Sequence, residues 1–262
     1  MKLYSFSQNS DMNFYRIYYQ NKLEGRYDDS WSILISHGIK SFYLLLRHLF
    51  TKNSKLLCMV HDQVPHPNIK YPIILILNIL ICLCATKIVI FSKPTGVFKY
   101  FNGKLDQWTL PDLMEGRSAI QLFEKNQIDL LTGIDRYILL CGRYDYYKLH
   151  PDFIANFKRI RRSLERTGLQ LVIVGRGWKK SPLAKHTPLF DSYVDDVLLF
   201  SLIKHAESIL LPYSSASQSG FYSLIKHFDK NVVMTKIPTL EEQYEQHAHM
   251  AKFVDNWNTY EF

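Results

Sequence analysis

Cysteine, glycine and proline are scarce in this chain of 262 residues, which contains 4, 11 and 10 of them. The cysteines all stand in apolar runs, and the two nearest, Cys82 and Cys84, have the wrong spacing for a zinc knuckle. We therefore predict four buried, reduced thiols (Cys58, Cys82, Cys84 and Cys141) in a cytosolic protein that needs no metal and no cofactor.

Long apolar segments are missing too. The N-terminus MKLYSFSQNSDMNFYR has no apolar core followed by small residues, so no signal peptide is predicted. The strongest apolar run, residues 71–86, is about five residues shorter than the roughly 20 that span a bilayer. Two interpretations stay open for it: a helix buried between a sheet and its neighbours, or a helix that dips into a membrane interface.

What the chain does have is hydrophobic content and positive charge. Hydrophobic residues make up 47% and charged residues 21%, which is typical of a folded chain. The net charge of +8 favours an anionic partner, either a nucleotide, a nucleic acid or a membrane surface. Because Lys and Arg are spread along the chain without a recognition motif, nucleic acid is not the expected partner.

Apolar runs of strand length alternate with helical segments, which predicts βαβ units and therefore an α/β fold with parallel sheets. The segment 113–135 is polar and mixed, so we expect an N-terminal domain at 1–115 and a C-terminal domain at 116–262. The expected strands are 2–6, 32–36, 55–60, 87–91, 137–141, 169–174, 189–194, 208–212 and 231–235. The expected helices are 41–50, 72–86, 151–166, 196–206 and one that begins after Ser219-Gly220.

Chemically capable residues follow several of these strands. His61, Asp62 and His66 come after strand 55–60, where they could transfer protons in a cleft or merely cap the strand and the next turn. Metal binding there would need more ligands than the segment supplies. After strand 137–141, Arg143 and Lys148 could clamp a pyrophosphate or could be ordinary solvated cations.

Two further strand ends carry glycine or small hydroxyl residues. Gly175 and Gly177 follow a buried strand but lack the third glycine of a dinucleotide fingerprint. The segment ILLPYSSASQSG at 209–220 runs from an apolar strand through small residues into a helical pattern. Small side chains and the free N–H groups of a helix start form an anion pocket, so we expect a phosphate at this segment.

In this order, the clusters resemble the family 4 glycosyltransferases over residues 56–242. The motifs that carry the resemblance are HDQVPHP at 61–67, LCGR with Lys148, LVIVG at 171–175, and PYSSASQSG with the later NVVMT at 231–235. The resemblance implies an α/β fold of GT-B type, with two Rossmann-like parallel-sheet domains that face a cleft, a reduced N-terminal domain and a shortened C-terminal end.

The resemblance also implies roles for individual residues. It assigns the diphosphate of the donor to Arg143, Lys148, Ser219 and Gly220, the last two through backbone amides. It places Ser217 and Gln218 near the donor sugar. On the other side of the cleft it implies a reaction centre with His61 and Asp62, and an acceptor side with His66.

The implied activity is a hexosyltransferase that moves a sugar from a UDP- or GDP-sugar to a lipid-linked or growing saccharide, with retention of anomeric configuration. The implied pathway is bacterial surface polysaccharide biosynthesis (O-antigen, lipopolysaccharide, capsule or exopolysaccharide), in the cytoplasm with peripheral contact to the membrane. Many family members carry glutamates where this chain has Ser217 and Ile225. The alternative is therefore a non-catalytic GT-B-like subunit that binds a nucleotide or a partner enzyme.

Overall fold

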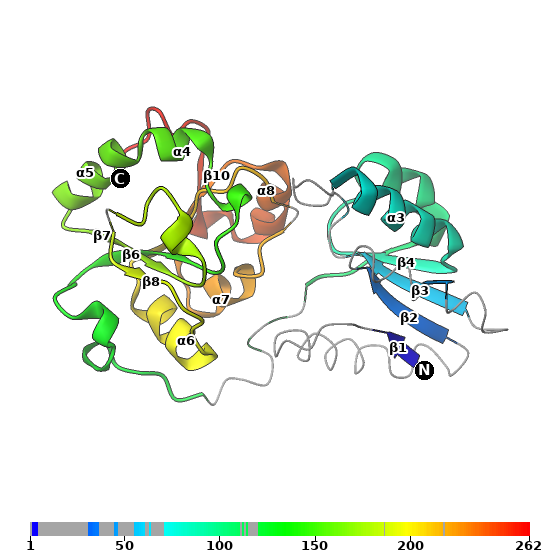
Figure 1. The fold of residues 1–262 in the computed structure, drawn as a ribbon, viewed down its shortest axis with the longest axis horizontal. Coiled ribbons are helices and arrows are strands. Elements are labelled where there is room, and N and C mark those ends of the chain that lie inside the picture. The colour runs from blue at the N-terminus through cyan, green and yellow to red at the C-terminus, as the bar shows by residue number, and fades with distance from the viewer. Residues whose placement is uncertain are drawn as a thin grey trace. The chain divides into compact units, whose positions relative to one another are not determined.

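The computed structural model describes residues 2–4, 31–36, 45–46, 55–60, 63, 71–110, 112, 114, 120–185, 187–216 and 218–262. The chain divides into two compact units, Met1–Pro111 and Asp112–Phe262. Each unit contains one sheet, and every strand pair in both sheets is parallel (Figure 1). The predicted α/β class with two parallel sheets is confirmed.

The first unit is a five-stranded sheet whose strands stand in sequence order. The strands are β1 (Lys2–Tyr4), β2 (Trp31–Ser36), β3 (Lys55–Val60), β4 (Lys87–Ile90) and β5 (Leu105–Gln107). Helix α3 (Tyr71–Cys84) connects β3 to β4, and the 3-10 helix η1 (Gly96–Lys104) connects β4 to β5. Crossover connections between parallel strands are right-handed, and the connections from β3 to β4 and from β4 to β5 run in the same direction across the sheet. Helices α3 and η1 therefore cover the same face.

Side chains on the two faces of this sheet form separate clusters. Cys58 of β3 packs in one cluster with Ile81 of α3 and Phe98 of η1, whereas Met59 packs on the other face with Trp108. The alternation is the period of two that a strand imposes. Of the predicted helix at 41–50, the structure describes Leu45 and Leu46, and both are helical.

Helix α3 is buried on one side only. Ile81 and Cys82 are fully buried, but Cys84 is exposed, as are several isoleucines and leucines of the same helix. Of the two interpretations of this segment, a helix buried between the sheet and its neighbours does not hold on the exposed side, and the prediction of four buried thiols is wrong at Cys84. None of the described helices is both long enough and apolar enough to cross a membrane.

The second unit is a six-stranded sheet in the order β11-β10-β9-β6-β7-β8. Its strands are β6 (Tyr137–Cys141), β7 (Gln170–Val174), β8 (Leu189–Phe190), β9 (Ser208–Leu211), β10 (Asn231–Thr235) and β11 (Ala251–Val254). Counted from β6, this is the Rossmann order 3-2-1-4-5-6 in reverse, with β6 and β9 as the central pair. The chain winds outward in opposite directions from that pair, so β6 and β9 flank the topological switch point.

Helices cover both faces of the second sheet. The α-helices are α4 (Pro151–Ala155), α5 (Phe157–Arg166), α6 (Asp196–His205), α7 (Tyr222–His227) and α8 (Pro238–Tyr244). The 3-10 helices are η2 (Lys125–Gln127), η3 (Asp129–Leu131), η4 (Tyr146–Lys148), η5 (Trp178–Lys180) and η6 (Glu245–Met250). One face packs against α6, α7 and α8, and the other against α4, α5 and Trp257 (Figure 1).

Several predicted elements differ from the observed ones in this unit. The predicted helix at 151–166 is two helices separated at Asn156, and the predicted strand at 189–194 is ordered as a strand only at Leu189–Phe190. Helix α7 begins at Tyr222, which agrees with the predicted helix start after Ser219-Gly220. Strand β11, which closes one edge of the sheet, was not predicted.

Candidate functional site

The loops that follow β6 and β9 leave the sheet side by side at its switch point. β6 pairs directly with β9, and the two loops are joined beyond the strands by backbone hydrogen bonds. His150 N–H donates to Pro212 O at 2.6 Å, and Ser214 N–H donates to Tyr147 O at 2.7 Å. Ligands of open α/β sheets bind outside the carboxyl ends of the strands at this point. The fold therefore brings together two clusters that lie about seventy residues apart in the sequence.

Lys148 lies where these two loops meet. A Cβ built on Gly142 would stand 2.8 Å from Lys148 Nζ and 3.2 Å from the Phe221 ring, so the ammonium group lies between the end of β6 and the start of α7. Its Nζ also lies 6.0 Å from the centre of the Tyr213 ring. The structure thus places Lys148 next to the serine-rich segment that follows β9.

Burial of Lys148 lowers the pKa of its side-chain amine. Desolvation lowers the pKa of this amine to about 8; the neighbouring Arg143 acts in the same direction, and Cys141 and Asp145 oppose it. None of the ion pairs among the described residues involves Lys148. A half-buried cation that forms no ion pair with a described carboxylate is costly unless an anion can reach it.

Arg143 follows Gly142 at the same strand end and is exposed. Gly142 has φ +102°, a backbone conformation that favours glycine, and this turn directs the chain out of β6 toward Arg143. Arg143 is near enough to Lys148 to lower its pKa by charge repulsion. Two cations held close together at a switch point produce the positive potential that a diphosphate requires.

The Ser219 turn is fixed by hydrogen bonds rather than left open. Gln243 of α8 binds both backbone groups of Ser219: Ser219 N–H donates to Gln243 Oε1 at 2.8 Å, and Gln243 Nε2 donates to Ser219 O at 3.0 Å. Phe221 N–H donates to Ser219 Oγ at 3.3 Å. The Ser219 amide that we expected to bind a phosphate is therefore already bonded to Gln243, and the amide of exposed Gly220 is the better candidate.

Helix α8 holds the rest of this segment as well. Thr239 Oγ1 donates to Ala216 O, and Thr239 and Gln243 stand four residues apart on one side of α8. Gln218 is half-buried between these two anchored residues. Thr239 and Gln243 were not predicted as site residues, because a contact across 24 residues leaves no local pattern in the sequence.

The Gly175–Gly177 turn supports the site rather than forming it. A Cβ on Gly175 would lie 2.3 Å from Gly142 O, so the ends of β6 and β7 can approach each other only at glycine. Trp178 Nε1 donates to Gly142 O at 2.7 Å. These contacts fix the backbone of Gly142 from behind.

The amides of the same turn are occupied by Asp191. Its carboxylate accepts hydrogen bonds from the backbone N–H groups of Gly177, Trp178 and Lys179. Desolvation would raise the pKa of Asp191, but these backbone hydrogen bonds outweigh it and hold the pKa below its usual value. An internal carboxylate thus fills the place that a phosphate would take in a glycine-rich turn.

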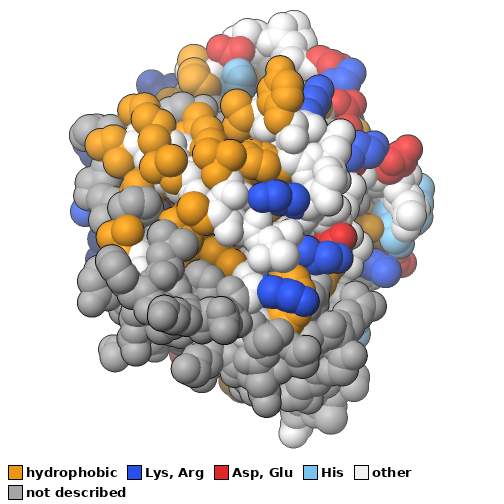
Figure 2. All heavy atoms as spheres, turned by 90° about the vertical axis from the view of Figure 1, so that its right-hand side faces the viewer, with side chains coloured by type: hydrophobic (Ala, Val, Ile, Leu, Met, Phe, Trp, Pro, Cys, Tyr) orange, Lys and Arg blue, Asp and Glu red, His pale blue; other side chains and the backbone are white. Residues whose placement is uncertain are grey.

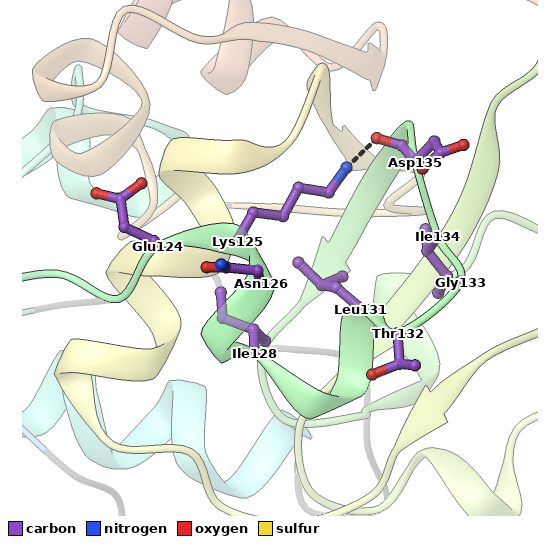
Figure 3. Close-up of a pocket in the computed structure, with 9 residues that line it drawn as sticks. All are labelled: Glu124, Lys125, Asn126, Ile128, Leu131, Thr132, Gly133, Ile134 and Asp135. Carbon is purple, nitrogen blue, oxygen red and sulfur yellow. Dashed lines mark hydrogen bonds between the residues drawn. The ribbon is translucent and has the colours of Figure 1, made fainter.

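A pocket of about 680 Å³ lies elsewhere in the second unit (Figure 3). It is lined by residues of η2, η3 and the turn to β6, including Lys125 and Asp135, whose backbone O accepts a hydrogen bond from Lys125 Nζ. Because Asp135 precedes β6, this pocket opens at the amino ends of the strands. It is therefore at the opposite edge of the sheet from Arg143 and Lys148.

The remaining predicted site residues, His61, Asp62, His66 and Ser217, lie outside the described residues. Gln63 is described and buried: its Nε2 donates to Ser92 Oγ at 2.9 Å and to Lys93 O at 2.9 Å, and its Oε1 accepts from Thr95 N–H at 2.8 Å. This amide connects the ends of β3 and β4, a role that we did not predict. In the described part of the chain, no group of three metal-ligating side chains comes together.

Similarity to solved structures identifies the fold of this chain. No family model matches the sequence, and no curated protein matches it in sequence. Solved structures do match: the sucrose-phosphate synthase of Thermosynechococcus elongatus has a TM-score of 0.62 at 12% identity, over 94% of this chain and 66% of its own. The chain has the GT-B fold.

Two other GT-B matches are complexes with a nucleotide. The trehalose-6-phosphate protein from E. coli bound with UDP-2-fluoro glucose has a TM-score of 0.59 at 12% identity, over 97% of this chain and 69% of its own. The S. aureus MnaA-UDP structure has a TM-score of 0.56 at 16% identity, over 97% of this chain and 71% of its own. At these identities the similarity extends to the GT-B architecture, and the roles of individual residues must be argued from their own geometry.

Proposed function

We propose that this GT-B protein is a glycosyltransferase that uses a nucleotide-sugar donor, and that the loops after β6 and β9 bind the donor's diphosphate. The observation that carries the proposal is Lys148, a half-buried cation with a pKa of about 8 at the switch point of a Rossmann-type sheet. Two of the similar structures contain UDP or a UDP-sugar, which supports the same class of ligand.

In this proposal the residues of the second unit stabilise the leaving group. As the sugar departs, negative charge develops on the diphosphate, and preorganised cations and N–H groups lower the energy of that state. Lys148 and Arg143 supply the charge, and Gly220 supplies a backbone N–H. Ser219 keeps the turn in place through its bonds to Gln243, and Ser217 and Gln218 lie next to the sugar.

The acceptor half of the proposal rests on the motif resemblance of the first unit. His61 accepts the proton of the acceptor hydroxyl, Asp62 beside it orients the imidazole, and His66 lies on the acceptor side. The acceptor is a lipid-linked or growing saccharide of bacterial surface polysaccharide biosynthesis, and transfer retains the anomeric configuration. The protein acts in the cytoplasm, at the inner face of the membrane.

A panel of UDP- and GDP-sugars tests the reaction. Purified protein should hydrolyse at least one donor slowly without acceptor, and Arg143→Ala should lower that rate by roughly 10- to 100-fold, the effect of one charge-assisted contact. Arg162→Ala, at an exposed arginine of α5, serves as the matched control and should leave the rate unchanged. Equal rates in the two variants would remove Arg143 from the donor site.

A second candidate, nucleotide binding without turnover, is favoured by Ile225. Many family 4 members carry a glutamate at the matching position, but Ile225 is fully buried in the core cluster beneath α7. It can offer no polar group to a donor. Tight binding of UDP or GDP without hydrolysis or transfer of any donor in the panel would support this second function over the first.

A further inference from the structure

Helix α3 in the first unit exposes a continuous apolar stripe. Its 14 residues include no charged side chain. Four members of the helix are 39–57% exposed, namely Ile73, Ile76, Leu80 and Leu83. Their spacing of three, four and three residues places them on one side of the helix, away from Ile81 and Cys82, which face the core. A water-exposed stripe of only isoleucine and leucine is costly unless something covers it.

The neighbouring helix η1 extends the stripe and adds positive charge. Phe98 of η1 packs in the same core cluster as Ile81 of α3, so the two helices adjoin, and Val97 and Tyr100 of η1 are exposed. Lys104 Nζ donates to Leu83 O at 3.2 Å, which places a cation at the end of the stripe. Figure 2 shows hydrophobic side chains gathered on this face with Lys or Arg side chains beside them.

Nearly all the net charge of the chain belongs to this unit. Residues 1–111 contain thirteen Lys and Arg against six Asp and Glu, whereas residues 112–262 contain nineteen against eighteen. The first unit therefore carries +7 of the total +8. Within residues 71–110 there are four lysines and one acid, Asp106, which Lys87 already neutralises at 3.2 Å.

We propose that the α3–η1 surface, defined by Ile73, Ile76, Leu80, Leu83, Val97 and Tyr100, docks on a bilayer that contains anionic lipids. The exposed α3 residues are isoleucines and leucines, which can enter the acyl boundary. Tyr100 suits the headgroup level, and the lysines attract the anionic headgroups. The surface is too short to span the bilayer, so the protein lies on it.

This proposal rests on the membrane location proposed above, but the surface lies outside the proposed donor site, so a failure to bind vesicles and a failure to bind a donor can be told apart. The full-length protein is mixed with vesicles of phosphatidylcholine alone or of phosphatidylcholine with phosphatidylglycerol, and the bound fraction is measured by flotation, without donor or acceptor. We expect binding to the anionic vesicles that weakens with added salt. Absence of binding, or equal binding to both vesicle types, would overturn the proposal.

Substitutions locate the contact. Ile76→Gln with Leu83→Gln should weaken partitioning at least about tenfold, and Lys99→Gln roughly fivefold. The controls are Tyr193→Gln and Lys185→Gln, which remove an exposed aromatic ring and an exposed cation from the second unit and should not change binding.

A second stripe variant, Ile73→Gln with Leu80→Gln, guards against a local folding defect in the first one. Far-ultraviolet circular dichroism checks that both stripe variants are folded. Unchanged binding by folded stripe variants would refute the assignment.

Discussion

Lys148 shows how one side chain can be held ready for an anion. In the folded chain its amine is partly dehydrated and stands near Arg143, and both effects lower its pKa to about 8. A bound diphosphate would offset both the dehydration of the amine and its repulsion by Arg143, because the diphosphate supplies negative charge where water is excluded. The free protein thus keeps an unfavourable charge that a ligand stabilises, as expected at a binding site rather than in a structural ion pair.

The pH dependence of UDP affinity follows from this pKa. Below pH 8 Lys148 is protonated in the free protein, and above pH 8 it loses the proton that binding requires. The phosphate itself is fully ionised above its second pKa of about 6. Calorimetric titration should therefore give a constant affinity near pH 7 that falls by up to about tenfold per unit above pH 8. A flat profile up to pH 9.5 would contradict a lowered Lys148 pKa that is linked to diphosphate binding.

Gly175 provides a test of the support behind the site. Gly175→Ala places a Cβ 2.3 Å from Gly142 O at φ +136°, so the strand ends must separate. We expect a loss of stability of about 2–4 kcal/mol, measured by urea unfolding.

Gly103→Ala is the matched control for Gly175→Ala. A Cβ at Gly103 meets nothing within 4 Å, and its backbone is not in the left-handed region. We expect a change within about 0.5 kcal/mol for this variant. Similar unfolding midpoints for the two variants would contradict the close approach of β6 and β7.

At the scale of elements, α8 acts as a support for the serine-rich segment. Gln243 pairs with both backbone groups of Ser219, as a neighbouring strand would, and Thr239 holds Ala216. The conformation of the segment after β9 therefore depends on a helix that contributes no atom of its own to the proposed donor site. A loop fixed from behind can present Gly220 without paying ordering entropy when the ligand binds.

Removal of this support should weaken donor binding without changing the chemistry. Gln243→Leu leaves both Ser219 backbone groups unpaired, which costs about 1–3 kcal/mol of stability and loosens the turn. In a donor-hydrolysis assay, KM should rise several-fold while kcat changes little, because no group that contacts the leaving diphosphate is lost. Gln246→Leu, an exposed glutamine on the next turn, is the control. A fall in kcat at unchanged KM would contradict a positioning role.

The strands of the second unit that are apolar along nearly their whole length were predicted, whereas the edge strand β11 was missed. β6, β7, β9 and β10 are almost entirely buried, and continuous apolar runs mark them. β11 is a short edge strand with only Val254 buried, so it has no such run. Helix α3 is apolar on every side, so no periodicity could show that Ile76 and Cys84 face water.

The meeting of these strand ends was predictable, but the hydrogen bonds around them were not. Parallel strands place their carboxyl ends together, so the residues after β6, Gly142, Arg143 and Lys148, were expected at the same edge of the second sheet as the segment after β9. The occupation of the Gly177 amides by Asp191, and of the Ser219 amide by Gln243, depends on tertiary contacts. Those contacts decide which N–H groups remain for a ligand.

At the scale of the whole molecule, the two units have separate cores. The two clusters of the second unit contain only residues from 114 onward, and the two clusters of the first unit contain only residues up to 110. Separate cores are the condition for independent folding. The charge is divided as well, since the first unit carries +7 of the net +8.

We therefore expect the fragment 112–262 to fold and bind UDP or GDP by itself. All the proposed diphosphate-binding residues and the helix that supports them belong to this fragment. Its urea unfolding should be cooperative, and its affinity for the nucleotide should lie within about threefold of the full chain's. A fragment that folds cooperatively but binds neither nucleotide would show that the site needs the first unit.

The proposed function requires above all that the strand ends of β6 and β9 bind a nucleoside diphosphate through Lys148. Calorimetric titration of UDP and of GDP at pH 7 into the wild type, Lys148→Met and Lys185→Met tests it directly. We predict that Lys148→Met weakens binding by roughly 10- to 100-fold, as loss of a charge-assisted contact does, with no loss of thermal stability because a partly buried cation is removed. Lys185→Met should bind as the wild type does. Wild-type affinity in a folded Lys148→Met variant, or no binding of either nucleotide to the wild type, would contradict the account.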